Sequence, residues 1–367
     1  MNDTFISFGF HSAVVQQDLE TIVADLSDGI EQLRGKCFLI TGANSMIGTY
    51  LVYALMHMEQ RFHLGTHIIA SSRNIDKALK LFGCFANDDN FTLLIQDVTE
   101  PIDIVTSADY VFHLAGNASP YYIEHDPVGI MRSNIIGMFN VLEYAKKHMS
   151  KRVVFASTRE VYGENVLEES LSEQSFGRID CIDARSCYPE SKRAAETLCK
   201  SYSVQYGVRF NTVRIAHAYG PGMKLSNDGR VMADLLDCAV NGRDIVLHST
   251  GEALRAFCYV SDVITGLLRI IMYGKENEAY NLANETEEIS IRCLAEKIAE
   301  LGTEWLTEIA GKVTHPLQIR FEIPETRSTS YCNYRRIHLE TRKLENLGWT
   351  PRIALYDGLR RTIFNKC

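Results

Sequence analysis

The sequence has no excess of positive charge. Its 38 lysines and arginines are outnumbered by 46 aspartates and glutamates, which gives a formal net charge of -8 at pH 7. Binding to nucleic acid or to an anionic membrane depends largely on clustered basic side chains, so neither class of partner is expected. An anionic ligand would have to be held by a local site.

The sequence also lacks long apolar runs and paired cysteines. No stretch of about 18 apolar residues is present, which predicts that no segment spans a membrane. The 10 cysteines are scattered without the Cys-x-x-Cys spacing of zinc sites, and no histidine cluster completes one, so no metal site is predicted. The N-terminus shows no signal-peptide pattern, and we expect reduced thiols in a cytoplasmic protein.

Short apolar runs alternate with helical patterns over more than half of the chain. We expect strands at residues 36–41, 67–70, 92–95, 110–114, 152–156 and 211–215, with helices between most of them. This alternation is typical of an α/β fold, here a Rossmann-type doubly wound parallel sheet. Such sheets bind ligands beyond the carboxyl ends of their strands.

Three segments are expected along the chain. Residues 1–35 contain no motif but carry apolar residues at helical spacing, which predicts an N-terminal helical extension packed on the main domain, with a dimer contact as the alternative. Residues 36–215 form the predicted NAD(P)-binding Rossmann domain. Turn-forming residues and shorter elements in 216–367 predict a smaller substrate-binding lobe, whose strands could return to the first domain.

A glycine-containing loop directly follows the first predicted strand and opens the first helix. It reads TGANSMIG over residues 41–48. A tight turn at this place can direct backbone N–H groups and a helix N-terminus toward the pyrophosphate of a dinucleotide. The alternative interpretation is a glycine-containing turn that binds no ligand. The cofactor contacts expected in this loop are Gly42, Asn44, Ser45, Met46, Ile47 and Gly48.

The ends of the following strands provide further candidates. Residues 71–74, at the end of the second predicted strand, include Arg73 but no acidic residue that could bind the ribose hydroxyls of NAD. Arg73 could contact the 2′-phosphate of NADP or be a solvated arginine, so the cofactor is left as NAD or NADP. Further cofactor contacts are expected at Asp97, Val98, Leu114, Ala115 and Gly116.

The run YPESK contains the strongest chemical signal. Its Tyr188 and Lys192 lie four residues apart, and Pro189 suits the first turn of a helix, so both side chains share one helix face. A nearby ammonium favours the phenolate, which lets a tyrosine act as base and acid. The four-residue spacing also occurs by chance on helices. Here, however, Thr158 lies near the end of the strand about one β–α unit earlier in the chain, where its hydroxyl could form a hydrogen bond with the reacting oxygen of a substrate.

Together these motifs resemble the extended short-chain dehydrogenase/reductase family, in its nucleotide-sugar epimerase/dehydratase branch, over roughly residues 36–360. The resemblance implies that Thr158, Tyr188 and Lys192 are catalytic, that the latter two also contact the cofactor, and that C4 of a nucleotide sugar is transiently oxidised. Ser45 replaces the middle glycine of the usual TGxxGxxG loop. Members of the branch often dimerise through two helices, here 127–148 and 189–206, so a homodimer is expected, although apolar helix faces also pack internally.

Within the branch, the sequence is similar to UDP-glucuronate decarboxylases in segments 118–120, 185–188, 227–231 and 255–262. The similarity implies that Arg255 clamps the pyrophosphate of the nucleotide sugar, because a guanidinium can bind phosphate oxygens in pairs. A surface charge is the alternative for any single arginine. The substrate contacts expected overall are Ser119, Arg159, Arg185, His217, Arg230, Arg255 and Arg327.

Epimerisation, loss of water and loss of carbon dioxide all begin with oxidation at C4 of the sugar. The residues near the sugar determine which of these reactions follows. Glu160 matches a catalytic glutamate of dehydratases and decarboxylases, and Arg327 falls near the decarboxylase arginine. Arg159 replaces the acid of 4,6-dehydratases, and a guanidinium is a very poor acid. Decarboxylases usually have serine there, so Arg159 departs from both groups and could attract a substrate carboxylate.

His217 is another departure, because the family usually has asparagine at this position. It is either an altered substrate contact or a packed histidine. The leading hypothesis is a decarboxylase of UDP-glucuronate or a relative, with a nucleotide-sugar 4-epimerase or 4,6-dehydratase as the alternative. A non-catalytic cofactor-binding protein that kept the fold is a third hypothesis, since fold does not fix function.

Overall fold

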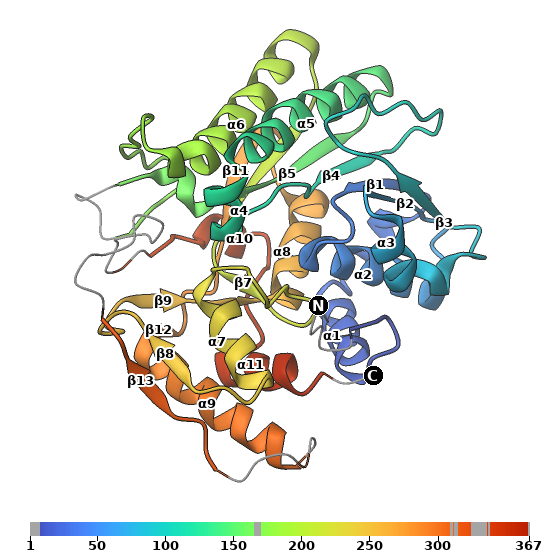
Figure 1. The fold of residues 1–367 in the computed structure, drawn as a ribbon. Coiled ribbons are helices and arrows are strands. Elements are labelled where there is room, and N and C mark those ends of the chain that lie inside the picture. Colours follow the sequence, from blue (N-terminus) through green and yellow to red (C-terminus); the bar gives the residue numbers. More distant parts are fainter. Residues whose placement is uncertain are drawn as a thin grey trace.

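The central feature of the computed structural model is a sheet of seven parallel strands in the order β11-β6-β5-β4-β1-β2-β3 (Figure 1). The structure describes residues 8–164, 170–308, 311, 315–323, 336 and 338–365. The Rossmann-type sheet is therefore confirmed, and β11 is a seventh strand that the strand prediction did not include. The strands are β1 (Cys37–Thr41), β2 (His67–Ser72), β3 (Phe91–Ile95), β4 (Tyr110–His113), β5 (Arg152–Thr158), β6 (Phe210–Ile215) and β11 (Glu278–Leu282).

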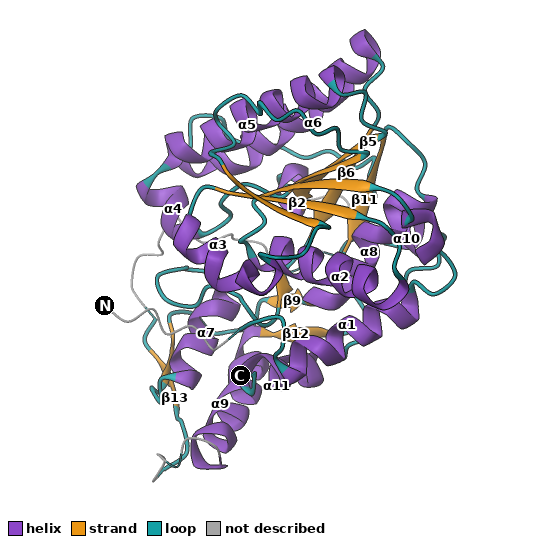
Figure 2. Ribbon diagram, turned by 90° about the vertical axis from the view of Figure 1, so that its right-hand side faces the viewer, coloured by secondary structure: helices purple, strands orange, loops and turns teal. Residues whose placement is uncertain are grey.

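Helices cover both faces of this sheet (Figures 1 and 2). One face carries α2 (Met46–Phe62), α3 (Ile75–Phe82) and α8 (Val260–Tyr273), and the other carries α5 (Pro127–Lys147) and α6 (Cys187–Tyr206). Successive strand residues point to opposite faces. In β1, Phe38 and Ile40 are buried in the core beneath α2 and α8, whereas Leu39 is buried beneath α5 and α6.

The N-terminal extension forms helix α1 (Ala13–Asp25), which packs against α2 and α8. Its apolar side, including Val15, Leu19 and Ile22, is fully buried. Asp18 is buried among them and accepts hydrogen bonds from the hydroxyls of Tyr50 and Tyr259, each at 2.8 Å, and from Arg361 at 2.6 Å. The helix is thereby tied to the rest of the chain by a polar contact as well as by packing.

A second group of elements lies on the α2 and α8 side of the sheet, in the lower half of Figure 1. It contains three two-stranded sheets, β7–β10, β8–β13 and β9–β12. Their strands are β7 (Ala218–Tyr219), β8 (Ile245–Leu247), β9 (Leu254–Ala256), β10 (Cys258–Tyr259), β12 (Glu288–Ser290) and β13 (Ile319–Phe321). The helices are α7 (Val231–Val240), α9 (Ile291–Glu308) and α11 (Leu355–Ile363).

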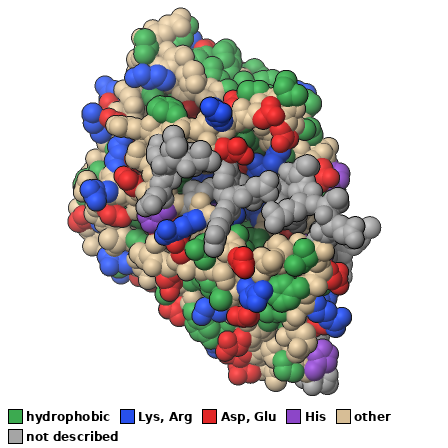
Figure 3. Space-filling view, turned by 90° about the vertical axis from the view of Figure 1, so that its left-hand side faces the viewer, with side chains coloured by type: hydrophobic (Ala, Val, Ile, Leu, Met, Phe, Trp, Pro, Cys, Tyr) green, Lys and Arg blue, Asp and Glu red, His purple; other side chains and the backbone are tan. Residues whose placement is uncertain are grey.

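Shorter helical elements connect these parts. They are η1 (Ile30–Leu33), η2 (Gly83–Phe85), α4 (Pro120–His125), η3 (Arg159–Tyr162), η4 (Ala184–Ser186) and α10 (Arg342–Glu345). In the part of the chain that the structure describes, no helix combines the length and apolarity needed to cross a bilayer. On the face drawn in Figure 3, basic and acidic side chains are interspersed over the coloured surface.

The strand order places a crevice beside β1 and β4. The chain moves from β1 to β2 and β3 on one side, and then returns to β4 on the other side of β1. Loops at the carboxyl ends of two such strands leave in opposite directions, which opens a site between them. The loops after Thr41 and His113 meet there, with the backbone N–H of Leu114 donating to the carbonyl of Thr41 at 3.1 Å.

Candidate active site

A cleft of about 1720 Å³ runs from the first β–α loop to the second group of elements. It brings together most of the residues predicted to bind or react. The predicted residues that line it are Asn44, Ser45, Met46, Ile47, Arg73, Leu114, Gly116, Ser119, Thr158, Arg159, Glu160, Arg185, Tyr188, Lys192, His217, Arg230 and Arg255.

The remaining predicted residues lie elsewhere. Gly42, Gly48, Asp97, Val98 and Ala115 are not part of the cleft lining. Val98 packs under α5, where its carbonyl accepts a hydrogen bond from Asn140 at 2.9 Å. Arg327 lies outside the described residues.

The first β–α loop has the close backbone packing that a dinucleotide site needs. Gly42 has a φ of 68°, and a Cβ there would lie 2.6 Å from the backbone nitrogen of Ala115. A Cβ at Gly48 would lie 2.4 Å from the carbonyl oxygen of Gly42. Both positions therefore require glycine, and the N-terminus of α2 opens into the cleft, where its N–H groups can receive a phosphate.

Ser45 fits the place where the family usually has glycine. Its φ of -77° lies in the extended region, so no left-handed backbone is needed there. Its hydroxyl accepts a hydrogen bond from the backbone N–H of Gly48 at 3.1 Å and caps α2. The same hydroxyl can still donate to a phosphate oxygen.

Arg73 follows β2 and lines the cleft. Its side chain is 76% exposed, and its nearest carboxylate oxygen, on Asp97, is 3.7 Å away. Asp97 accepts hydrogen bonds from the backbone and hydroxyl of Thr99, and these bonds lower the pKa of Asp97. Arg73 therefore forms a weak, solvated ion pair.

Thr158, Tyr188 and Lys192 converge at the base of the cleft. Thr158 is the last residue of β5, and the other two lie in the first two turns of α6. Thr158 lies close enough to Tyr188 for its hydroxyl to act on the ionisation of the phenol. The Nζ of Lys192 donates to the carbonyl of Ala156 at 2.8 Å and lies 5.9 Å from the centre of the Tyr188 ring.

Burial dominates the electrostatics of these groups. Burial raises the pKa of Tyr188, and the charge of Glu160 adds to this effect. Thr158, Arg230 and Arg159 act in the opposite direction and favour the phenolate. Burial lowers the pKa of Lys192 to about 7, which makes its charge sensitive to any ligand that enters.

Glu160 follows the catalytic strand by two residues and faces the same cleft. Arg185 binds its two carboxylate oxygens, with distances of 2.9 and 3.2 Å from the guanidinium nitrogens. Both side chains are largely shielded from solvent. Such a paired contact fixes the orientation of the carboxylate beside Tyr188.

His217 also lines the cleft and has a left-handed backbone at a φ of 45°. Burial, together with the positive charges of Arg159 and Arg255, lowers the pKa of His217 well below its usual value. The imidazole is therefore neutral at physiological pH. Its ring contacts Phe257, with 5.5 Å between ring centres.

Asn134 was missed by the reasoning from sequence. It lies on α5, fully buried, and its Nδ2 donates to the hydroxyl of Ser191 at 2.9 Å. Its Oδ1 has no hydrogen-bond partner among the described residues, and a Cβ on Gly116 would lie 2.7 Å from that oxygen. An asparagine at a helical spacing that places it among mostly apolar, inward-facing residues of α5 is the signal that could have identified it.

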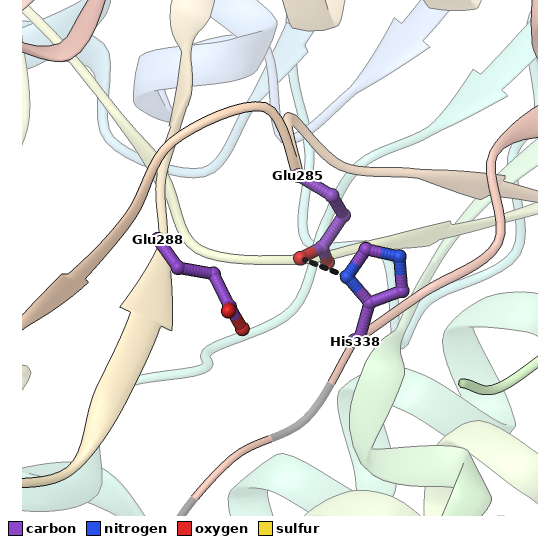
Figure 4. Close-up of side chains that lie close together, drawn as sticks. All are labelled: Glu285, Glu288 and His338. Carbon is purple, nitrogen blue, oxygen red and sulfur yellow. Dashed lines mark ion pairs between the residues drawn. The ribbon is translucent and has the colours of Figure 1, made fainter. Parts of the chain in front are cut away.

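A second polar cluster lies outside the cleft, where Glu285, Glu288 and His338 offer ligand atoms within 4.8 Å of one another (Figure 4). His338 and Glu285 point toward one another, with 3.3 Å between Nδ1 and Oε2. Arg336 binds both oxygens of Glu288, at 2.8 and 2.9 Å. Each carboxylate thus already faces a basic side chain, and the cluster joins the loop after β11 to the chain around His338.

The chain is similar in sequence and fold to known proteins. The NAD dependent epimerase/dehydratase family model matches residues 38–283. The UDP-glucuronic acid decarboxylase 5 of Arabidopsis thaliana is 33% identical over 88% of this chain and 86% of its own length.

Two solved structures share the fold. The UDP-glucose 4-epimerase of Thermotoga maritima, with UDP-glucose, has a TM-score of 0.71 at 24% identity and covers 89% of this chain and 97% of its own. The structure of the UDP-glucuronic acid 4-epimerase of Bacillus cereus contains UDP-glucuronic acid and NAD. It has a TM-score of 0.73 at 20% identity, and the match covers 89% of this chain and 98% of the epimerase chain. The chain therefore belongs to the NAD dependent epimerase/dehydratase family.

Proposed function

We propose that the protein is an NAD-dependent decarboxylase of a nucleotide sugar that carries a carboxylate at C6, with UDP-glucuronate as the first candidate. The observation that carries the proposal is the placement of Glu160, held by Arg185, beside the group formed by Thr158, Tyr188 and Lys192. The identity to UDP-glucuronic acid decarboxylases over most of the chain supports the same reaction.

The proposed roles follow from the chemistry of each side chain. Tyr188 takes the proton of the C4 hydroxyl, and Thr158 hydrogen-bonds the same oxygen. When bound, the nicotinamide supplies a hydride acceptor for C4 and later returns the hydride. A C4 ketone makes the C6 carboxylate a β-keto acid, which can lose carbon dioxide, and we assign the proton transfer at C5 to Glu160.

The test is incubation of the purified protein with UDP-glucuronate and NAD, followed by mass spectrometry of the nucleotide sugars. A product lighter by carbon dioxide is expected. Glu160→Gln should reduce its formation strongly, and Tyr188→Phe should abolish it while the variant still binds UDP. Full turnover by Glu160→Gln would remove the basis for the proposal.

The second candidate is a 4-epimerase or a 4,6-dehydratase, which would also use Thr158, Tyr188 and Lys192. A product of unchanged mass but altered chromatographic retention would identify the epimerase, and loss of water the dehydratase. Arg159 disfavours the dehydratase, because a guanidinium cannot protonate a leaving hydroxyl. Absence of any product from all candidate sugars would favour a non-catalytic cofactor-binding protein.

We propose NAD as the cofactor, with NADP as the alternative favoured by Arg73. The guanidinium of Arg73 is solvated and only loosely paired with Asp97, so a 2′-phosphate could reach it. Fluorescence titration with NADH and NADPH decides between them. If Arg73 binds the 2′-phosphate, Arg73→Met should weaken the binding of NADPH but not that of NADH.

We also propose a cytoplasmic homodimer that associates through α5 and α6. The described cysteines are all free thiols, as in a reducing compartment. Large apolar side chains remain exposed on the two helices, and such a patch is typical of an interaction site. They are Val128, Met131, Ile136 and Phe139 on α5 and Val204 on α6. Light scattering of the wild type and of Phe139→Glu tests the dimer.

A further inference from the structure

Arg159 presents an uncompensated positive charge to the cleft. Its residue is only 8% exposed, yet its guanidinium forms no hydrogen bond or ion pair within the part of the chain that the structure describes. A charge that is buried to this extent is costly unless a counter-ion satisfies it. The cleft is the open side of this guanidinium, so the missing partner would come from a ligand.

The other arginines of the cleft differ from Arg159 in this respect. Arg185 is held by Glu160, and Arg230 is held by Asp228 through two nitrogens. The remaining cleft arginines are also engaged: Arg243 with Asp237, Arg73 with Asp97, and Arg255 with the carbonyl of Leu254. Arg159 is thus distinguished among the described cleft arginines by the lack of a partner.

The nearby acids are already occupied. Glu160 is bound by Arg185 at both oxygens. Burial raises the pKa of Glu285, and the charge of Arg159 opposes this effect only weakly. The carboxylate of Glu285 faces Nδ1 of His338 at 3.3 Å and accepts a hydrogen bond from the backbone of Leu339 at 3.1 Å. Neither carboxylate is therefore positioned as the direct counter-ion of Arg159.

Arg159 lies beside the atoms that react. It directly follows Thr158 in the chain, and its charge acts on the Tyr188 hydroxyl and on His217. If Tyr188 takes the proton of a sugar hydroxyl, an anion bound by Arg159 must be a substituent close to that carbon. A carboxylate two carbons away meets this condition, and its two oxygens match the fork of a guanidinium.

We propose that Arg159 is a specificity-determining residue that binds a sugar carboxylate two carbons away from the reacting carbon and selects acidic over neutral nucleotide sugars. The proposal rests on the proposed function for the identity of the sugar ring. It adds the residue that recognises the acid group, at a position where both the dehydratases and the decarboxylases that the sequence resembles carry other side chains.

The experiment measures binding without turnover. The protein is saturated with NADH, which cannot accept a hydride, and is titrated calorimetrically with UDP-glucuronate, UDP-glucose and UDP. The wild type should prefer UDP-glucuronate to UDP-glucose. Arg159→Met should weaken UDP-glucuronate binding about ten- to one-hundred-fold, the range expected for loss of a hydrogen-bonded charge pair, and change UDP-glucose and UDP by less than about twofold.

Two further variants serve as controls. Arg159→Lys keeps the charge without the fork and should restore part of the preference. Arg34→Met removes one positive charge at a distant exposed site, where Arg34 pairs with Glu31, and should bind all three ligands as the wild type does. A wild type without preference for UDP-glucuronate, or an Arg159→Met variant that keeps the preference, would overturn the proposal.

The two proposals fail in distinguishable ways. An Arg159-dependent preference for UDP-glucuronate without release of carbon dioxide would support the carboxylate site and exclude decarboxylation of this sugar. Release of carbon dioxide with a preference that survives Arg159→Met would support the decarboxylase and overturn the role of Arg159.

Discussion

Arg185 and Glu160 form a two-point ion pair in the lining of the cleft, with nitrogen–oxygen distances of 2.9 and 3.2 Å. Arg185 lies in η4, just before α6, and Glu160 lies just after β5. The pair therefore links the two segments that carry Thr158 and Tyr188. A change in either partner should affect the position of the other near the reacting atoms.

The first prediction concerns this pair. Arg185→Met removes the cation, so the carboxylate of Glu160 loses its fixed orientation, and kcat should fall by about one hundred-fold, the effect expected from a small misplacement. Arg185→Lys should show a smaller loss, because it keeps a charge but only one contact. Steady-state kinetics provide the measurement, and an unchanged kcat in Arg185→Met would show that the orientation of Glu160 does not depend on Arg185.

The second prediction concerns the pH dependence of stability without cofactor. Burial lowers the pKa of Lys192 in the folded protein to about 7 from an ordinary value of 10.5. Between these values the unfolded chain binds more protons, so this group makes the free energy of unfolding rise with pH. Lys192→Met removes the effect, so the Tm of the variant relative to the wild type should be highest near pH 6 and fall toward pH 9.

The matched control for Lys192→Met is Lys200→Met, because Lys200 is an exposed lysine on the same helix. Its Tm relative to the wild type should not vary with pH. A pH-independent difference for Lys192→Met would contradict the assignment of a buried lysine with a lowered pKa.

The third prediction concerns His217. Burial, together with the positive charges of Arg159 and Arg255, lowers the pKa of its imidazole well below the usual value, so the neutral form is favoured near neutral pH. The pH–rate profiles of the wild type and His217→Asn should therefore have the same shape. His217→Val should be destabilised by about 1–2 kcal/mol in urea unfolding, because its backbone is left-handed and a β-branched residue tolerates this poorly.

The fourth prediction compares two positions of the cofactor loop. Gly42→Ala places a methyl group against Ala115 in a left-handed turn, so it should weaken NADH binding and cost at least about 1–2 kcal/mol of stability. Ser45→Gly loses only a helix cap and should cost a few tenths of a kcal/mol. NADH affinity from fluorescence titration and the Tm of each variant are the measurements. Equal losses in Gly42→Ala and Ser45→Gly would show that the turn at Gly42 is not critical.

The fifth prediction concerns Asp18. Its carboxylate accepts hydrogen bonds from Tyr50, Tyr259 and Arg361. Asp18→Leu leaves two buried hydroxyls and a guanidinium without their partner, and should lower the free energy of unfolding by about 3 kcal/mol. Urea unfolding measures this loss, and Glu20→Leu, at a more exposed position of the same helix, should change it by less than about 0.5 kcal/mol.

The parts of the fold that rest on local patterns could be predicted from the sequence. The apolar runs that become β1 to β6 are short and bounded by turns, and the loop after Thr41 has its glycines where the backbone needs them. Strand β11 did not stand out, because residues 216–277, which contain part of the second group of elements, separate it from its partner β6. Its place at the sheet edge is a long-range contact.

The same distinction holds for the cleft. Tyr188 and Lys192 could be identified because their spacing is a local property of one helix. The pairing of Glu160 with Arg185 and the burial of Asn134 depend on distant segments that fold against one another. That Arg159 lacks a partner could not be predicted from the sequence, since any of the 46 acidic residues could have been its counter-ion.

The contact between Asp18 and Arg361 also bears on the order in which the protein folds. The two residues are 343 positions apart, and the hydroxyl of Ser12 likewise binds Asn365 over 353 positions. Such contacts close the largest loops in the chain and form slowly, because the entropy of loop closure is lost before any contact repays it. During synthesis, helix α1 leaves the ribosome long before Arg361 is made. Helix α1 can pack against α2 and α8 before then, but its contact with Arg361 can form only after the last helix has been made.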